Sequence, residues 1–181
     1  MQKPFIIILD GPMGAGKTTV AKILHLKFDR TAFLSWDELK WLVNGLENNL
    51  ENKNLIAEIR FEMAKKMLAN GISVIVEGGF NKKERLDLYL ELAKEQKLNL
   101  LGYYFSAPEE ILIERAMARP KPDTEKEKIS KENIVENIKN YPSKEESFET
   151  IETDLLKVDE IVQRIISNIE NLNGKFFERI F

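Results

Sequence analysis

The segment Gly11–Thr18 reads Gly-Pro-Met-Gly-Ala-Gly-Lys-Thr and fills every fixed position of the phosphate-binding pattern G-x-x-x-x-G-K-[ST]. An apolar run, Phe5–Leu9, precedes the pattern, and the segment Lys17–Phe28 after it carries apolar residues at helical spacing. In a strand–loop–helix unit, main-chain N–H groups and the positive end of the helix dipole attract phosphate. The sequence therefore predicts a nucleotide-binding loop at this place.

The residue types in the loop suggest individual roles. We expect Lys17 to contact the β- and γ-phosphates of ATP and the Thr18 hydroxyl to bind Mg²⁺. The full nucleotide-binding set predicted from the sequence is Gly11, Met13, Gly14, Ala15, Gly16, Lys17, Thr18 and Thr19. A glycine-rich turn without a ligand is the alternative, and the matching flanks make it the weaker one.

Two carboxylates are predicted at the same edge of the sheet as the loop. Asp37 follows the second predicted strand and Glu77 ends the third, and ligands of open parallel sheets collect beyond the carboxyl ends of the strands. Asp37 can accept a proton from an acceptor hydroxyl, or it can cap the next helix, for which Ser35 is the better candidate. Glu77 can orient a Mg²⁺-bound water or be a solvated carboxylate at a strand end, and both interpretations stay open.

Arginines form the third group of candidates. Arg115 and Arg119 are four residues apart on one face of a predicted helix. That helix leads into the charged segment 120–131, which we interpret as a mobile helical lid. A lid guanidinium can neutralise charge in the transition state of phosphoryl transfer, whereas ion pairs with nearby acids are the alternative. Arg85 either reaches the acceptor or lies on the surface.

A parallel sheet is needed to position these residues, and the chain predicts one, because apolar strand-like runs alternate with helical patterns. The predicted strands are 5–9, 31–35, 72–77, 98–105 and 148–153. The predicted helices are 17–28, 36–43, 55–68, 81–97, 107–119, 132–140 and 158–172. Residues 47–54 are predicted to be a loop. Asn173-Gly174 is predicted to end the last helix, before an apolar tail (175–181) that packs on the sheet or on another subunit. The predicted fold is thus α/β, a three-layer αβα phosphate-loop fold with a five-stranded parallel sheet, in a single domain over residues 1–181.

Composition excludes several function classes. The net charge of −3 gives no bulk attraction to nucleic acid or anionic lipid, although a local basic patch could still bind them. The chain has no cysteine, which excludes disulfides, thiolate metal sites and a cysteine nucleophile. No apolar stretch is long enough for a membrane span and the start lacks a signal-peptide pattern, so we expect a cytoplasmic protein without a membrane partner.

Three further segments follow the loop. They are Ser35-Trp36-Asp37-Glu38-Leu39-Lys40, then Val74–Phe80 with Arg85 after it, and finally Ala107–Arg119, which matches A-P-x-E-x-L-x-x-R-x-x-x-R at every fixed position. Their order resembles that of the small phosphate-loop kinases grouped with the kinase domain of polynucleotide kinase, the zeta toxins and chloramphenicol phosphotransferase. The resemblance covers nearly the whole chain.

The resemblance implies a phosphoryl-transfer reaction but no particular acceptor, because members of the group phosphorylate different molecules. It implies that Asp37 activates the acceptor hydroxyl, that Arg115 and Arg119 are lid arginines, and that Lys40 and Arg85 lie beside the acceptor. Glu77 stands where an aspartate is common, which leaves its role toward the metal open.

The sequence is therefore compatible with three functions. The first is an ATP- and Mg²⁺-dependent kinase that phosphorylates a hydroxyl of a small molecule or of a nucleic-acid 5′ end. The second is a nucleoside-monophosphate kinase, which needs several acceptor-side arginines, and only Arg30, Arg60 and Arg85 precede the lid helix. The third is a nucleotide-binding switch or NTPase without a transfer substrate. The acceptor, the choice between ATP and GTP, and the oligomeric state are not predicted.

Overall fold

The computed structural model describes residues 3–118 and 130–177, and for residues 173–177 it describes the backbone alone. In this part of the chain, parallel strands form a five-stranded sheet in the order β2-β3-β1-β4-β5. The strands are β1 (Phe5–Asp10), β2 (Thr31–Ser35), β3 (Ser73–Glu77), β4 (Asn99–Ser106) and β5 (Glu149–Glu152). The predicted five-stranded parallel sheet is confirmed.

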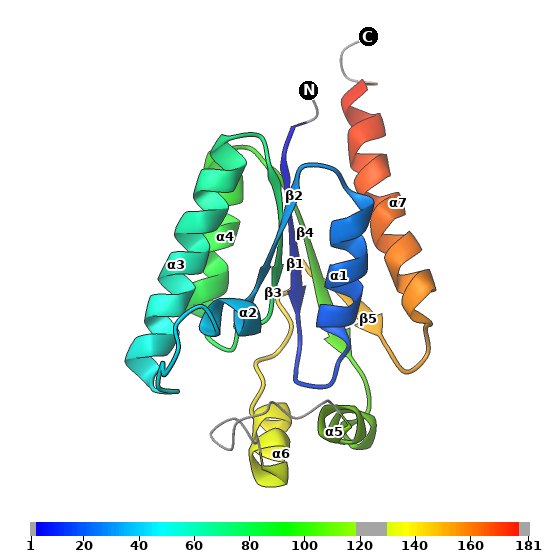
Figure 1. The fold of residues 1–181 in the computed structure, drawn as a ribbon. Coiled ribbons are helices and arrows are strands. Elements are labelled where there is room, and N and C mark those ends of the chain that lie inside the picture. The colour runs from blue at the N-terminus through cyan, green and yellow to red at the C-terminus, as the bar shows by residue number, and fades with distance from the viewer. Residues whose placement is uncertain (1–2, 119–129, 178–181) are drawn as a thin grey trace.

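Helices cover both faces of this sheet, as Figure 1 shows. They are α1 (Lys17–Lys27), α2 (Trp36–Lys40), α3 (Leu50–Ala69), α4 (Lys83–Glu95), α5 (Glu109–Met117), α6 (Lys131–Lys139) and α7 (Val158–Phe177). Helices α1 and α7 lie on one face, and α3 and α4 lie on the other. Helices α5 and α6 lie beyond the carboxyl ends of the strands. The result is the predicted three-layer αβα arrangement.

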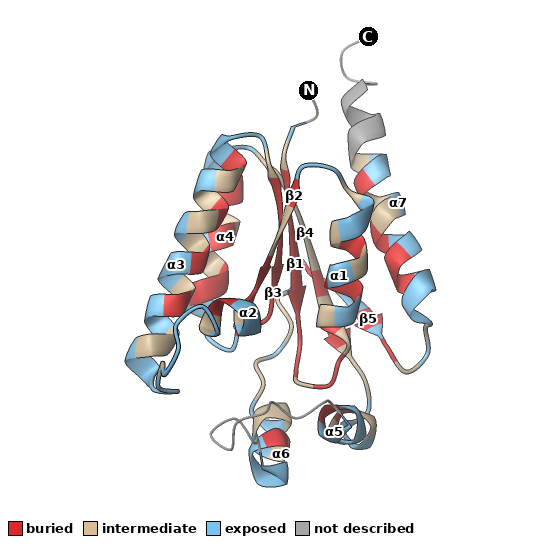
Figure 2. Cartoon of the chain, in the orientation of Figure 1, coloured by how far each residue is buried: buried red, intermediate tan, exposed pale blue. Residues whose placement is uncertain are grey.

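Strand β1 is central in the sheet, and its side chains from Phe5 to Leu9 are apolar toward both faces. All six of its residues are buried, and Ile7 pairs with Ile75 of β3 and Leu101 of β4. Continuous apolar runs are typical of parallel strands that helices cover on both sides. Figure 2 shows this burial in the sheet and on the inward faces of the helices. The carboxyl ends of the strands therefore meet at one edge, where the loop after β1 lies.

Two apolar clusters hold the layers together. On one face, Leu9 and Phe105 of the sheet pack in one cluster with Leu24 of α1 and Ile165 of α7. On the other face, the second cluster includes Ile8, Val76, Leu68, Leu86 and Tyr89. Burying each large aliphatic side chain stabilises the fold by about 1.5–3 kcal/mol. These two clusters fix the helices on the sheet whose edge carries the candidate site.

Two predicted boundaries near α3 were wrong. Helix α3 begins at Leu50, inside the segment 47–54 that we predicted to be a loop. Asn49 caps it, since its side-chain oxygen accepts a hydrogen bond from the Asn52 amide at 2.9 Å. Helix α2 ends at Lys40 instead of residue 43. One asparagine of this segment, Asn49, is a helix cap, and Asn52 and Asn54 lie within the helix instead of in a loop.

The predicted end of the last helix was also wrong, because α7 continues through Gly174 to Phe177. An interior glycine costs about 1 kcal/mol relative to alanine, and the buried stripe of Ile161, Ile165 and Ile169 offsets that cost. The apolar tail predicted at 175–181 lies outside the described side chains. Arg119 and residues 120–129 of the predicted lid likewise lie outside the described residues. Across 3–118 and 130–177, every helix is too short or too polar to span a lipid bilayer.

Candidate nucleotide and acceptor site

The phosphate loop connects β1 to α1, as predicted. Helix α1 begins at Lys17 with Gly16 as its N-cap, and its first turn contains no acidic residue. Lys17 is buried, and its ammonium donates hydrogen bonds to the carbonyl oxygens of Gly11 at 2.7 Å and Pro12 at 2.8 Å. The amides of the first turn and the Lys17 charge therefore converge on the loop, which suits a bound polyphosphate.

Thr18, Ser35 and Glu77 form a connected group of oxygen atoms beside the loop. The Thr18 hydroxyl donates to Glu77 Oε1 at 3.0 Å, and the Ser35 hydroxyl donates to Glu77 Oε2 at 3.2 Å. Glu77 is 6% exposed, which rules out a solvated carboxylate at a strand end. Ser35 also caps α2 by accepting from the Glu38 amide. Asp37 is therefore not the cap, in line with the prediction that Ser35 is the better candidate.

This group fits a magnesium ion. Mg²⁺ prefers oxygen ligands and usually combines one or two protein groups with phosphate oxygens and water. Thr18 and Glu77 supply a hydroxyl and a carboxylate at the loop. Among the described residues, no cluster of three or more histidines and acids offers a complete protein-only metal site. A metal here would depend on the phosphates of a nucleotide for the rest of its ligands.

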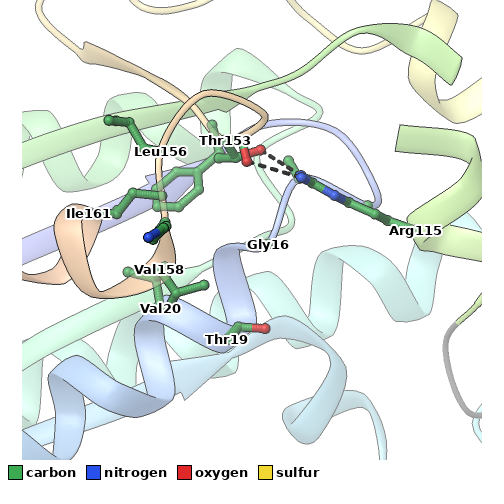
Figure 3. Close-up of a pocket in the computed structure, with 12 residues that line it drawn as sticks. Gly16, Thr19, Val20, Arg115, Thr153, Leu156, Val158 and Ile161 are labelled. Carbon is green, nitrogen blue, oxygen red and sulfur yellow. Dashed lines mark hydrogen bonds between the residues drawn. The ribbon is translucent and has the colours of Figure 1, made fainter. Parts of the chain in front are cut away.

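A first pocket of about 510 Å³ opens on one side of the loop (Figure 3). Its wall includes Gly16 and Thr19 of the loop and α1, together with Ile161 of α7. Arg115 crosses its edge, donating from Nη1 to the Thr153 hydroxyl at 2.9 Å and from Nη2 to the Thr153 carbonyl at 3.0 Å. Arg115 thus joins α5 to the segment after β5, beside a largely apolar space.

A second pocket of about 260 Å³ opens on the other side of the loop. It brings together seven of the residues predicted from the sequence, namely Gly11, Met13, Lys17, Asp37, Lys40, Glu77 and Arg85. Asp37 is exposed there, in the first turn of α2. Asp37 and Arg115, each predicted to be catalytic, therefore line different pockets, with the phosphate loop between them.

Arg85 lies in the wall of the second pocket. It is 6% exposed, so it is not the surface residue of the alternative interpretation. Its guanidinium donates to the Gly79 carbonyl at 3.3 Å and to the side-chain oxygens of Asn81 and Asn54, each at 3.1 Å. The guanidinium also lies over the Trp36 ring, 4.9 Å from its centroid. Burial lowers the pKa of Arg85, and the nearby charge of Arg60 lowers it further.

Sequence comparison identifies the family of this chain. The family model AAA_33, described as an AAA domain, matches residues 6–142. The chain belongs to this family. No curated protein shows significant sequence similarity to it.

Solved structures similar to this AAA domain share its fold. The Mycobacterium tuberculosis APS kinase CysC in complex with AMPPNP and APS has a TM-score of 0.72 at 17% identity, over 94% of this chain and 99% of that one. A gluconokinase from Sinorhizobium meliloti has a TM-score of 0.67 at 16% identity, over 99% of both chains. The Deinococcus radiodurans tunicamycin resistance protein has a TM-score of 0.64 at 17% identity, over 92% of this chain and 95% of that one. The fold of this AAA domain is thus that of the phosphate-loop kinases, as the resemblance predicted.

Arg60 is a residue of the AAA domain site that we did not predict. It is fully buried in α3, and its Nη1 donates to the carbonyl oxygens of Glu77 at 3.1 Å and Gly78 at 2.6 Å. Its guanidinium lies between the rings of Trp36 and Phe80, at 5.1 and 4.7 Å. Burial lowers its pKa, while Tyr89 and Glu77 act in the opposite direction. Arg60 therefore fixes the main chain at the end of β3.

The sequence did contain a signal for Arg60. The buried residues of α3 are Ile56, Arg60, Ala64 and Leu68, at a strict spacing of four. A charged residue on the buried stripe of an amphipathic helix needs partners inside the protein. Such a residue is a candidate for a structural role beside a site.

Asn137 of helix α6 and Tyr141, which follows that helix, contact the phosphate loop and the residue before it, and we predicted neither contact. The Asn137 side-chain oxygen accepts a hydrogen bond from the Met13 amide at 3.3 Å. The Tyr141 hydroxyl donates to the carboxylate of Asp10, the residue before the loop. Burial raises the pKa of both Asp10 and Tyr141. Asp10 thus joins the loop to the segment that follows the predicted lid.

Proposed function

We propose that this AAA domain is an ATP- and Mg²⁺-dependent kinase that transfers the γ-phosphoryl group to a hydroxyl of a small molecule. The observation that carries the proposal is the position of the phosphate loop between two pockets. One pocket is larger and mostly apolar, as a nucleotide base requires, and the other contains two carboxylates and several cations. The kinases among the solved structures of this fold add support.

The nucleotide half of the site uses the loop. In the proposed complex, the loop amides and Lys17 bind the β- and γ-phosphates. The first pocket, bordered by Thr19, receives the base, and we call it the base-side pocket. Thr18 and Glu77 would hold Mg²⁺, which supplies positive charge on the phosphate oxygens. Arg115 borders the base-side pocket and is available for contacts to the nucleotide. Arg119 stays a proposed contributor from the lid.

The acceptor half of the site uses Asp37. In the proposed step, the acceptor hydroxyl oxygen bonds to the γ-phosphorus while the bond from that phosphorus to the bridging oxygen of ADP breaks. The hydroxyl proton passes to the Asp37 carboxylate, and ADP leaves with the bridging oxygen. Asp37 suits this role because it lines the same pocket as Lys17 and is not occupied as a helix cap.

A transfer assay tests the proposal. The protein is incubated with Mg²⁺, ATP labelled in the γ-phosphate, and a panel of sugars, sugar acids, nucleosides, aminoglycosides and 5′-hydroxyl oligonucleotides. Label in an acid-stable ester of a small molecule is the expected result, and Lys17→Ala should abolish it. Label that appears only as inorganic phosphate would instead indicate an NTPase, and label on a phosphate group of the acceptor would indicate a nucleoside-monophosphate kinase. Transfer confined to oligonucleotide ends would contradict the small-molecule assignment.

A further inference from the structure

The second pocket has an excess of positive charge in its wall. Apart from Lys17, which belongs to the phosphate loop, the cations that line it are Lys40, Lys53 and Arg85. The carboxylates that line it are Asp37 and Glu77, and Glu77 already accepts hydrogen bonds from Thr18 and Ser35. The acceptor side of the pocket is therefore cationic, although the whole chain carries a net charge of −3.

Of these three cations, Arg85 is the one that several hydrogen bonds within the protein hold in place. Its hydrogen-bond partners are a main-chain carbonyl and two side-chain amides, all of them neutral. Among the described residues, the guanidinium forms no salt bridge. The three bonds use fewer than the five N–H groups of a guanidinium, so donors remain for a ligand in the pocket.

Arg60 places a second positive charge behind the first. Both guanidiniums lie against the Trp36 ring, Arg60 at 5.1 Å and Arg85 at 4.9 Å from its centroid. Within residues 3–118 and 130–177, Arg60 forms no salt bridge either, and its hydrogen-bond acceptors are carbonyl oxygens. The charge of Glu77 acts favourably on Arg60, but among the described residues no salt bridge pairs Arg85, and a buried cation without a paired carboxylate is costly. An anion bound in the pocket would offset that cost.

We propose that the acceptor carries an oxyanion group, a phosphate, sulfate or carboxylate, that binds to the Arg85 guanidinium with Lys40 and Lys53 beside it. The planar fork of an arginine matches two oxygens of such a group. Arg60 is a positioning residue, since it holds Trp36 and the main chain after β3 and does not line the pocket. This inference rests on the proposed function only for the statement that the ligand of this pocket is the acceptor.

Sulfate binding tests the site without any transfer reaction. The protein is first saturated with AMPPNP and Mg²⁺, which fills the phosphate loop, and sodium sulfate is then titrated in a calorimeter at constant ionic strength. We expect saturable binding to the unaltered protein, at least tenfold weaker in Arg85→Gln. The matched control is Arg30→Gln, since Arg30 is an exposed arginine before β2 that bonds to the Asn70 carbonyl. It should bind sulfate as the unaltered protein does.

Two results would overturn the inference: no saturable sulfate binding to the folded, nucleotide-loaded protein, or equal affinity in Arg85→Gln. If Arg85→Gln fails to fold by circular dichroism, the Lys40→Gln, Lys53→Gln double variant takes its place, with an expected loss of at least threefold and the same refuting result. Matched acceptors, ribose against ribose 5-phosphate and glucose against gluconate, then separate phosphate from carboxylate. If no acceptor is phosphorylated, the proposed function fails while sulfate binding still decides the inference.

Discussion

A methyl group added at Gly79 should disturb the second pocket through Trp36. Gly79 has a φ of +76°, and a Cβ atom on it would lie 2.2 Å from Cε3 of the Trp36 indole. Ordinary contact needs 3.4–4 Å, so the ring must move by roughly an ångström or more. The left-handed backbone costs a non-glycine residue about 1–2 kcal/mol, and overpacking of this kind adds about 1–3 kcal/mol. We expect Gly79→Ala to lower the free energy of unfolding by about 2–5 kcal/mol.

Gly45 supplies the matched control. Its φ is +78°, nearly the same, but an added Cβ meets no atom within 4 Å. Gly45→Ala should therefore cost only the backbone part, about 1–2 kcal/mol. Urea denaturation of both variants measures the difference. Because Arg60 and Arg85 both pack on the Trp36 ring, Gly79→Ala should also weaken sulfate binding while AMPPNP binding stays unchanged. Equal destabilisation by the two substitutions, with sulfate affinity unchanged, would refute the assignment of Trp36 as the support of the pocket wall.

Three further predictions concern single side chains. Asp37→Asn should lower kcat by about 10²–10⁴-fold and leave the Kd for ATP unchanged, and steady-state rates near those of the unaltered protein would remove Asp37 from the reaction. Arg115→Gln loses two hydrogen bonds to Thr153 and should weaken calorimetric ATP binding about tenfold, or about 1.4 kcal/mol; an effect on acceptor KM alone would contradict its place beside the nucleotide. Burial raises the pKa of Asp10 above its ordinary 3.8, so the charged carboxylate lowers the free energy of unfolding at pH values above the folded-state pKa. This destabilisation disappears as the pH falls toward 3.8, where the carboxyl group is protonated. Asp10→Asn should therefore raise Tm at pH 7 but not near pH 4, whereas the exposed-site control Asp29→Asn should show no such pH-dependent gain; a gain equal at both pH values argues against the burial effect.

The sequence predicted most of the fold because its strands are short apolar runs with clear boundaries. The order of strands and helices, the parallel sheet and the loop between β1 and α1 all followed from periodicity and from one motif. One error came where tertiary packing outweighs local preference, and another where a local capping residue was not recognised. Helix α7 passes through Gly174 because its isoleucine stripe packs on the sheet, and α3 begins early because Asn49 caps it.

The candidate site was predictable to the extent that strand ends determine positions. Asp37 and Glu77 lie near the phosphate loop because parallel strands end at the same edge of the sheet, and both residues line the second pocket. Arg60 and Tyr141 were missed because their partners come from distant parts of the chain. The contacts of Arg60 with Glu77 and of Tyr141 with Asp10 span 17 and 131 residues. The spacing in α3 indicates that Arg60 is buried, but no local pattern names the distant partners of Arg60 or Tyr141.

The most direct test of the account is nucleotide binding by the segment Gly11–Thr18. Titration of AMPPNP into the protein with Mg²⁺ should give one binding site per chain, and the affinity should fall at least 100-fold in Lys17→Ala, whose folding is checked by thermal melting. Removing Mg²⁺ with a chelator should weaken binding, since Thr18 and Glu77 would then lack the metal between them and the phosphates. Absence of binding heat, or equal affinity in folded Lys17→Ala, would contradict the central claim that this loop binds a triphosphate.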